Sequence, residues 1–342
     1  MKIAIVNDLP MAVESLRRLV TAGGRHEVAW VAENGKDAIE CCAEKVPDLI
    51  LMDLVMPIMN GVESTRRIMK KSPCPILVVT ATVASHSGLV FEAMGAGALD
   101  VVATPVIESE KNSPSYELLD KIDRIGKLIG IRGQRSSLAR IPQKDGRELR
   151  GSGPCLIVIG SSTGGPQALL QVLGAIPHNH SAAIVVVQHM DEQFTGGLAK
   201  WLDSQLDISV QVLKEGGRPQ PGVVVIPSTN YHVVMGPNTT LTYSVEPKEN
   251  FYHPSVDVFF HSVARYWRGS CIGVILTGMG DDGAKGMLAL QQQGHLTIAQ
   301  NQESSVVFGM PKAAIKLGAA QEILSLREIG LKIKKILMAE RK

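Results

Sequence analysis

The sequence predicts an α/β protein built from two successive doubly wound parallel sheets, and three observations lead to that prediction. Short apolar runs rich in Val and Ile recur along the chain. Segments with apolar residues at helical spacing lie between many of these runs, an alternation typical of parallel βαβ units. A stretch rich in Gly and Pro interrupts the alternation once, and a length of 342 residues suits two domains.

The first domain is predicted to span residues 1–131 and to contain five strands. The strands are short apolar runs, in order Ile3–Val6, Val28–Val31, Leu49–Met52, Ile76–Val79 and Asp100–Val102. The first helix is marked by apolar residues at helical spacing, which are Ala12, Val13, Leu16, Leu19 and Val20. The fifth helix is marked in the same way by Leu118, Leu119, Ile122, Ile125 and Ile129. Five such repeats form one doubly wound parallel sheet.

Residues 132–153 are predicted to be a linker, because Gly and Pro replace the apolar periodicity there. Six basic residues and two acidic residues lie in this stretch. No aromatic residue interleaves them to stack on bases, so a solvated tether is favoured over a nucleic-acid site. Apolar runs then return, which predicts a second doubly wound α/β domain over residues 154–342; they are Cys155–Ile159, Ala182–Val187, Val223–Ile226 and Cys271–Leu276.

Composition and charge exclude several classes of protein. A net charge of +2 is too small to indicate nucleic acid or an anionic membrane as the main partner. The N-terminal apolar stretch is shorter than that of a signal peptide, and no run of about 18 apolar residues occurs, so direct membrane insertion is not expected. The five cysteines include no C-x-x-C pair, which argues against a zinc site or a disulfide framework. A cytoplasmic location is therefore expected.

Polar residues follow three strands of the first domain, namely Asp8, Asp53 and Thr80. In open α/β sheets the ligand site lies beyond the carboxyl ends of the strands. Two carboxylates from neighbouring strands suit Mg²⁺, which needs few protein oxygens. An isolated strand-end Asp more often caps the next helix, but the residues around Asp53 favour a functional site.

The segment from Asp53 through Pro57 to Gly61, with Asp8 upstream and Thr80-Ala81 downstream, resembles the response-regulator receiver family, whose fold is flavodoxin-like. The resemblance implies that Asp53 accepts a phosphoryl group and that Thr80 contacts it. It also implies that Asp8, Asp53 and the Val55 carbonyl hold Mg²⁺, and that a CheA-type histidine kinase is the phosphodonor.

Three positions depart from the receiver pattern. The family has a second acid where this chain has Asn7, often an aromatic switch residue where it has Val101, and a lysine where it has Thr104. Loss of the lysine removes a point cation from an anionic site. Phosphorylation is therefore expected to be less efficient or less coupled to the output than in typical receivers.

A candidate nucleophile, Ser162, lies after the first strand of the second domain in the sequence Gly160-Ser161-Ser162-Thr163-Gly164. The G-x-S-x-G spacing places Ser162 on a sharp strand-to-helix turn near the positive end of a helix dipole. Such a turn can equally bind phosphate through backbone N–H groups. The motif by itself leaves both interpretations open.

Two later strand ends carry partners for a serine nucleophile. His189 follows one apolar run, and Asp281-Asp282 follow another after Thr277-Gly278-Met279-Gly280. A serine needs a base to take its proton and an anion to orient that base, so a Ser, a His and an Asp on one edge of the sheet support nucleophilic catalysis. The chain order Ser, His, Asp differs from that of common α/β-hydrolases. Spacing does not decide between Asp281 and Asp282.

These three motifs, together with Pro254-Ser255-Val256-Asp257-Val258 and Gly309-Met310-Pro311, resemble the chemotaxis protein-glutamate methylesterase (CheB) family over about residues 154–338. The resemblance implies that Ser162 is the nucleophile, His189 the general base and acid, Asp282 the orienting carboxylate and the Met279 N–H an oxyanion donor. The presence of Asn7 and Thr104 also makes the chain resemble the Wsp-type branch of this family, whose receptor pathway feeds a diguanylate cyclase.

The resemblance implies hydrolysis of glutamate γ-methyl esters on methylated chemoreceptor-type proteins to glutamate and methanol, with no cofactor for the esterase. Some family members also deamidate receptor glutamines. One alternative is a signalling scaffold that binds receptors without turnover, which the intact Ser162, His189 and Asp282 disfavour. A receiver with a DNA-binding output is disfavoured because no helix-turn-helix is recognisable.

Overall fold

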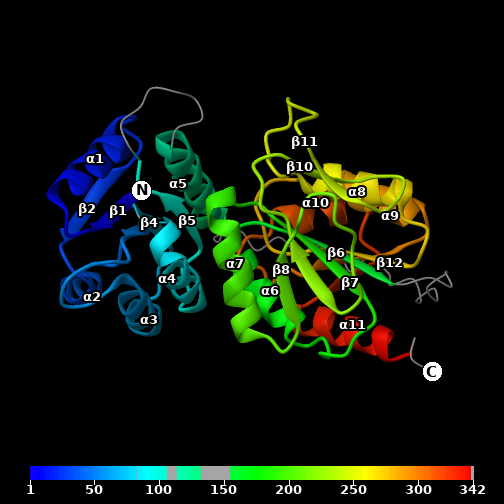
Figure 1. Ribbon diagram of the computed structural model, residues 1–342. Helices are drawn as coiled ribbons and strands as arrows, with labels where there is room; N and C mark the ends of the chain where they lie inside the picture. Colours follow the sequence, from blue (N-terminus) through cyan, green and yellow to red (C-terminus); the bar gives the residue numbers. More distant parts are fainter. Residues whose placement is uncertain (82, 106–113, 132–154, 340–342) are drawn as a thin grey trace. The chain divides into compact units, whose positions relative to one another are not determined.

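The computed structural model describes residues 1–81, 83–105, 114–131 and 155–339. The chain divides into two units, Met1–Ala139 and Arg140–Lys342, and Figure 1 shows a sheet flanked by helices in each. The linker expected at residues 132–153 lies outside the described residues. Within the described ranges, every helix is too short or too polar to cross a lipid bilayer.

The first unit contains a five-stranded sheet in the order β2-β1-β3-β4-β5, with all neighbouring strands parallel. Its strands are β1 (Lys2–Val6), β2 (Glu27–Ala32), β3 (Leu49–Met52), β4 (Ile76–Thr80) and β5 (Asp100–Ala103). Its helices are α1 (Pro10–Thr21), α2 (Gly35–Glu44), α3 (Gly61–Lys71), α4 (Val83–Gly95) and α5 (Pro114–Ile131). This is the flavodoxin-like order, and the prediction of a doubly wound sheet is confirmed.

Burial on both faces explains why the inner strands β1, β3 and β4 of the first unit are continuous apolar runs. Alternate strand residues, such as Ile3, Ile5 and Leu51, pack against α1 and α5, which contribute Leu16 and Ile122 to the same cluster. Two helices of this unit, α2 and α3, begin at polar N-caps. Asn34 accepts hydrogen bonds from two backbone N–H groups of α2, and Asn60 accepts one from α3.

The second unit contains a seven-stranded parallel sheet in the order β14-β13-β12-β6-β7-β9-β8. Its strands are β6 (Leu156–Ser161), β7 (Ala183–Gln188), β8 (Ser209–Val212), β9 (Val223–Ile226), β12 (Cys271–Ile275), β13 (Leu296–Gln300) and β14 (Glu322–Leu324). A separate antiparallel hairpin consists of β10 (His232–Met235) and β11 (Leu241–Ser244). The prediction of a second doubly wound sheet is confirmed.

Two helical layers cover this sheet (Figure 1). On one face lie α8 (Val256–Tyr266), α9 (Ala284–Gln292) and α10 (Met310–Lys316), and on the other lie α6 (Gly165–Leu173), α7 (Glu192–Gln205) and α11 (Leu326–Ala339). Phe259, Phe260 and Met287 fill the first layer together with strand residues. In the second, Gly330 lets α11 approach the end of α6, because an added Cβ would lie 3.1 Å from the Val172 carbonyl oxygen and 2.6 Å from Ala175, just after the helix.

Several elements of the second unit were not predicted from the sequence, namely β8, β13, β14 and the hairpin. β8 exposes three of its four residues, and β14 has only three residues, so neither forms an apolar run. β13 carries Thr297 and Gln300, which are fully buried but satisfied: the Thr297 hydroxyl donates to the Ala319 carbonyl at 2.7 Å, and Gln300 Oε1 accepts from the Thr277 N–H at 2.6 Å.

Each sheet has a point at which the strand order reverses. In the first unit β1 lies between β2 and β3, and in the second β6 lies between β7 and β12. Loops that leave neighbouring strands toward opposite sides open a crevice at the carboxyl ends, where α/β proteins bind ligands. The residues after β1 and β3, and those after β6 and β12, therefore line the two candidate sites.

Candidate functional site

The crevice of the first unit contains Asn7 and Asp8 after β1 and Asp53 after β3. The Asn7 amide donates to Asp53 Oδ2 at 3.2 Å, and the Leu54 N–H donates to Oδ1 at 2.7 Å. Asn7 is buried, whereas Asp8 and Asp53 are half-buried. The strand ends thus hold the Asp53 carboxylate in a fixed orientation while leaving it accessible.

The loop after Asp53 is fixed by Gly61, the first residue of α3. A Cβ at this position would overlap the Asp53 carbonyl oxygen, so only glycine lets the helix begin so close to the strand end. Val55, in that loop, is exposed. Glycine at the end of the Asp53–Gly61 segment is thus a structural requirement of the site.

The other expected residues of the receiver lie on the neighbouring strands. Thr80 ends β4 and is buried, and its carbonyl accepts a hydrogen bond from the Thr104 N–H at 2.9 Å. Thr104, which replaces the lysine, is therefore at the same edge of the sheet. Val101 is buried within β5, so no aromatic ring is available there to move between an inward and an outward position.

The donor set at this edge fits a hard cation that takes few protein ligands. Asp8, Asp53 and the Val55 carbonyl offer oxygen ligands only, as Mg²⁺ prefers. Across the described residues, no group of three or more His, Cys, Asp or Glu side chains is arranged to hold a metal ion. A zinc-type or calcium-type cage is thus not observed there.

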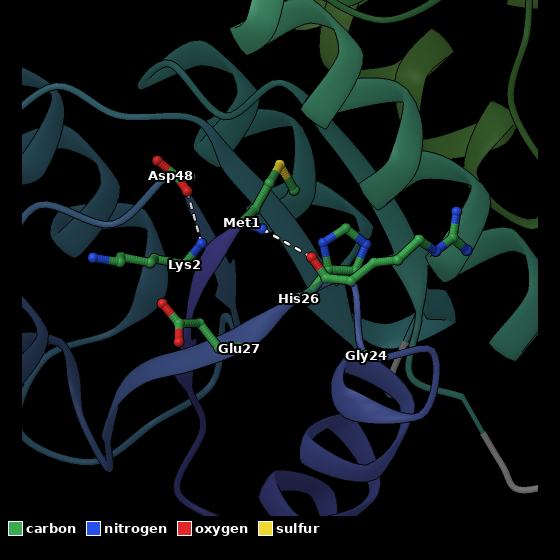
Figure 2. A pocket seen from close by; sticks show the side chains of 7 residues that line it. Met1, Lys2, Gly24, His26, Glu27 and Asp48 are labelled. Atoms are coloured by element: carbon green, nitrogen blue, oxygen red, sulfur yellow. Dashed lines mark hydrogen bonds between the residues drawn. The ribbon is translucent and has the colours of Figure 1, made fainter.

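A hollow at the opposite edge of the same sheet is not a candidate site (Figure 2). It lies at the amino ends of β1 and β2, where the Met1 ammonium donates to the Arg25 carbonyl at 3.1 Å and the Lys2 N–H donates to Asp48 Oδ2 at 2.7 Å. These two hydrogen bonds join residues that line the hollow, and the hollow lies at the strand ends opposite to those that carry Asp53.

In the second unit the turn after β6 positions Ser162. The Ser162 N–H donates to the Thr277 carbonyl at 3.0 Å, and the Ser162 carbonyl accepts from the Gly165 N–H at 2.7 Å. Gly164 has a φ of +77°, which glycine adopts without strain. The turn ends in α6, whose first turn contains Pro166. Ser162 is therefore held at the end of β6, beside the loop that follows β12.

Gln188 connects this turn to the end of β7. Its Oε1 accepts from the Ser161 hydroxyl at 2.6 Å, and its amide donates to the carbonyls of Ser162 at 2.8 Å and His189 at 3.1 Å. A Cβ at Gly165 would overlap the Gln188 amide oxygen. The side chain of Gln188 thus fixes the backbone that carries Ser162 relative to the backbone that carries His189.

The His189 ring is bonded to Asp282. His189 Nε2 and Asp282 Oδ2 are 2.7 Å apart, and both side chains are at least nine-tenths buried. Asp281 is exposed. Of the two aspartates between which spacing did not decide, Asp282 is therefore the one bonded to His189, and its catalytic role stays a prediction.

The Asp282 carboxylate rests on the N-terminus of α8. Its Oδ1 accepts from the Ser255 hydroxyl at 2.8 Å and the Asp257 N–H at 3.1 Å, and its Oδ2 also accepts from the Val256 N–H at 2.7 Å. Burial by itself would raise the pKa of Asp282, but the hydrogen bond and charge of His189 and the donors of α8 hold that pKa below its ordinary value. The carboxylate therefore stays ionised.

The second ring nitrogen of His189, Nδ1, is buried and makes no hydrogen bond to the described residues. An ionised Asp282 requires a proton on Nε2, so in the neutral ring Nδ1 carries the lone pair. Nδ1 is thus the atom of His189 that can accept a proton.

The loop after β12 approaches Ser162 closely. A Cβ at Gly278 would lie 2.8 Å from the Ser162 Cβ. The Gly278 N–H is already bonded to the Val307 carbonyl at 3.0 Å. Met279, the next residue, therefore lies near Ser162, and the role of its N–H as an oxyanion donor stays a prediction.

Comparison with known proteins shows to which family the chain belongs. Residues 157–333 match the family model of the CheB methylesterase, and residues 3–111 match that of the response regulator receiver domain. The first match covers more than half of the chain. The chain belongs to the CheB methylesterase family. A solved relative is the CheB methylesterase catalytic domain of Thermotoga maritima, which is 37% identical with a TM-score of 0.51 and covers 54% of this chain and 99% of its own.

Curated relatives extend the CheB similarity over the receiver as well. A Pseudomonas fluorescens protein named protein-glutamate methylesterase/protein-glutamine glutaminase 1 is 51% identical over 98% of this chain and 99% of its own length. A Pseudomonas putida protein named protein-glutamate methylesterase/protein-glutamine glutaminase of group 3 operon is 51% identical over 96% of this chain and 97% of its own.

Several residues of the CheB unit that shape the site were not identified from the sequence. Ser255 and the first N–H groups of α8 hold Asp282, Gln188 fixes the turn, and Tyr252 covers the His189 ring. The segment Pro254–Val258 was one of the motifs that carried the resemblance, so a signal existed for Ser255. No pattern in the sequence pointed to Tyr252.

Proposed function

We propose that this CheB-family chain is a receiver-controlled protein-glutamate methylesterase. Its substrate would be glutamate γ-methyl esters on chemoreceptor-type signalling proteins, and its products glutamate and methanol. The observation that carries the proposal is the His189–Asp282 bond at 2.7 Å, which leaves Nδ1 as the basic atom at the edge that also carries Ser162. The nearly full-length relatives named for this activity support it.

In the first step the Ser162 hydroxyl attacks the γ-carbonyl carbon of the ester. His189 Nδ1 takes the hydroxyl proton, and Asp282 stabilises the imidazolium that forms. Collapse of the tetrahedral intermediate breaks the bond to the methoxy group, which leaves as methanol with the proton from His189. A γ-glutamyl ester of Ser162 remains.

In the second step water attacks this ester, and His189 again takes a proton and returns it to Ser162. One ester and one water thus give one glutamate and one methanol. The Met279 N–H would bind the oxyanion in both steps. The same two steps at the side-chain amide of a glutamine would release ammonia instead of methanol. This corresponds to the glutaminase activity in the names of the relatives.

Control would come from the receiver. Asp53 would accept a phosphoryl group from a CheA-type histidine kinase, and the Thr80 hydroxyl would contact the phosphoryl oxygens. Mg²⁺, held by Asp8, Asp53 and the Val55 carbonyl, would supply charge neutralisation when bound. The esterase chemistry described above uses protein groups and water. Both the kinase and the receptor segments concerned are expected in the cytoplasm.

A non-catalytic scaffold is the weaker alternative, because it gives no reason for a buried, ionised Asp282 bonded to a histidine. The test is methanol release from methylated receptor membranes. The wild-type protein should release methanol, Ser162→Ala should not, and Ser209→Ala, at an exposed serine of the edge strand β8, should behave like the wild type. Equal release by Ser162→Ala would remove the serine mechanism.

A further inference from the structure

Tyr252 lies face to face with the ring of His189. The two ring centroids are 4.4 Å apart, and the ring planes differ by only 10°. Tyr252 belongs to the loop between β11 and α8, and its side chain is half-buried. An aromatic ring thus covers one face of the proposed catalytic base.

The Tyr252 ring is itself held from several directions. Phe251 packs edge-on against it, with centroids 5.2 Å apart and an angle of 85°. The Tyr252 N–H donates to Asn250 Oδ1 at 3.1 Å. Its hydroxyl lies against Gly280, where an added Cβ would overlap the phenol oxygen. The same tyrosine therefore contacts the His189 ring and the loop that contains Met279.

This arrangement restricts His189 in a way that its bond to Asp282 does not. The bond between Nε2 and Asp282 fixes one atom of the ring but leaves the ring free to tilt about that atom. A second ring in parallel contact fixes the plane, and so the direction of the Nδ1 lone pair. Stacked aromatic pairs are favourable beyond the area that they bury.

The stack also acts on charge. Two titratable groups of the described residues contact the His189 ring: Asp282 at Nε2 and the Tyr252 phenol over its face. The face of an aromatic ring carries negative electrostatic potential and attracts planar cations. The protonated ring formed during ester cleavage is therefore stabilised more than the neutral ring.

We propose that Tyr252 is a positioning residue for His189, which fixes the plane of the imidazole and stabilises its protonated form; this rests on the proposed esterase function. In this role Tyr252 does not contact the ester. Its effect is expected on kcat and on the pH dependence, with KM for the receptor unchanged.

The test compares two variants of Tyr252 in the full-length protein, with methanol release measured from pH 5 to 9. Tyr252→Leu keeps an apolar side chain, though a smaller one, and removes the aromatic face; it should lower kcat by about twofold to tenfold, the range expected for an aromatic pair. Since the protonated ring loses its partner, the midpoint of the acid limb should move to lower pH by a few tenths of a unit to about one unit. Tyr252→Phe keeps the stack and should retain both the rate and the midpoint.

Tyr231→Leu is the matched control, because Tyr231 is an exposed tyrosine of the same unit, located just before β10. It should leave kcat and the midpoint unchanged. A Tyr252→Leu protein with wild-type kcat and midpoint would overturn the proposal. A lower kcat with an unchanged midpoint would mean that Tyr252 only fills space beside His189. A change in KM alone would mean that Tyr252 contacts the substrate. Either result would overturn the proposal. A wild-type protein without activity would instead refute the proposed function.

Discussion

Replacing Asp282 with asparagine probes the best-defined interaction of the site. The carboxylate accepts four hydrogen bonds: Oδ2 from His189 Nε2 and the Val256 N–H, and Oδ1 from the Ser255 hydroxyl and the Asp257 N–H. An amide has one oxygen and one NH₂ group. In either orientation the NH₂ group faces one backbone N–H of α8, so that N–H loses its acceptor.

The loss of folding stability in Asp282→Asn follows from these contacts. A buried N–H without an acceptor costs about 1–3 kcal/mol. Loss of a negative charge at the N-terminus of a helix costs a further ~0.3–1 kcal/mol. Asp282→Asn should therefore lower the free energy of unfolding of the catalytic unit by about 1–4 kcal/mol, which leaves a domain of ordinary stability folded.

The loss of activity depends on the orientation of the new amide. If its oxygen still accepts from His189, only the charge that stabilises the imidazolium is lost, which corresponds to about 10²-fold. If its NH₂ group faces His189 instead, Nε2 must become the acceptor and the ring proton moves to Nδ1. Nδ1 can then no longer act as the base. A fall of about 10⁴-fold is then expected.

Methanol release measures the loss of activity, and urea unfolding measures the loss of stability. Unfolding is followed by the fluorescence of the buried Trp201 and Trp267. The matched control is Asp281→Asn, which removes the same charge at the exposed neighbour. It should change stability by less than about 0.5 kcal/mol and keep the activity. If Asp281→Asn were the inactive variant and Asp282→Asn the active one, the proposed triad would be refuted.

Three further predictions concern the receiver, acid stability and the coupling of the two units. Asp53→Asn should abolish Mg²⁺-dependent, acid-labile phosphorylation by acetyl phosphate, and Thr104→Lys should strengthen it because a cation is restored; label that survives Asp53→Asn would place the acceptor elsewhere. Because the pKa of Asp282 is lowered in the folded state, its contribution to stability is present above about pH 4 and is lost as the pH falls through that lowered pKa. Ser255→Ala removes one of the responsible hydrogen bonds, so its acid unfolding, followed by fluorescence, should begin at higher pH than that of the wild type, and equal midpoints would contradict this assignment. Finally, we expect the receiver to restrain the esterase, so a fragment that begins near Gly151 should release methanol from receptors faster than the unphosphorylated full chain; equal or slower release by a folded fragment would indicate activation or recruitment instead.

Much of the site could be predicted because parallel sheets place their strand ends on one edge. Asp53 follows an apolar run of the first unit, and Ser162 and His189 follow apolar runs of the second. The strand pattern was therefore enough to predict that each residue lies at the carboxyl ends of its own sheet. The strand order then explains why Asp53 shares its crevice with Asn7, and Ser162 with Thr277: each pair follows the two strands at which the order reverses.

The rest depended on contacts that the pattern does not encode. Whether Asp281 or Asp282 faces His189 is decided by the local turn, in which Gly280 and Gly283 have φ values of +83° and +90°, and by the donors of α8. Tyr252 reaches His189 from the loop that joins the hairpin to α8, two elements that pack against each other. The edge strand β8 has no apolar run to reveal it.

The central claim is that Ser162 carries the acyl group during turnover. Mass spectrometry of the full-length protein after treatment with a serine-directed fluorophosphonate, or after rapid acid quench of a reaction with methylated receptor, tests it directly. A covalent adduct on the peptide that contains Ser162 is predicted in the wild type, with much slower formation in His189→Ala. An adduct on another residue in active protein, or methanol release by Ser162→Ala at the wild-type rate, would contradict the account.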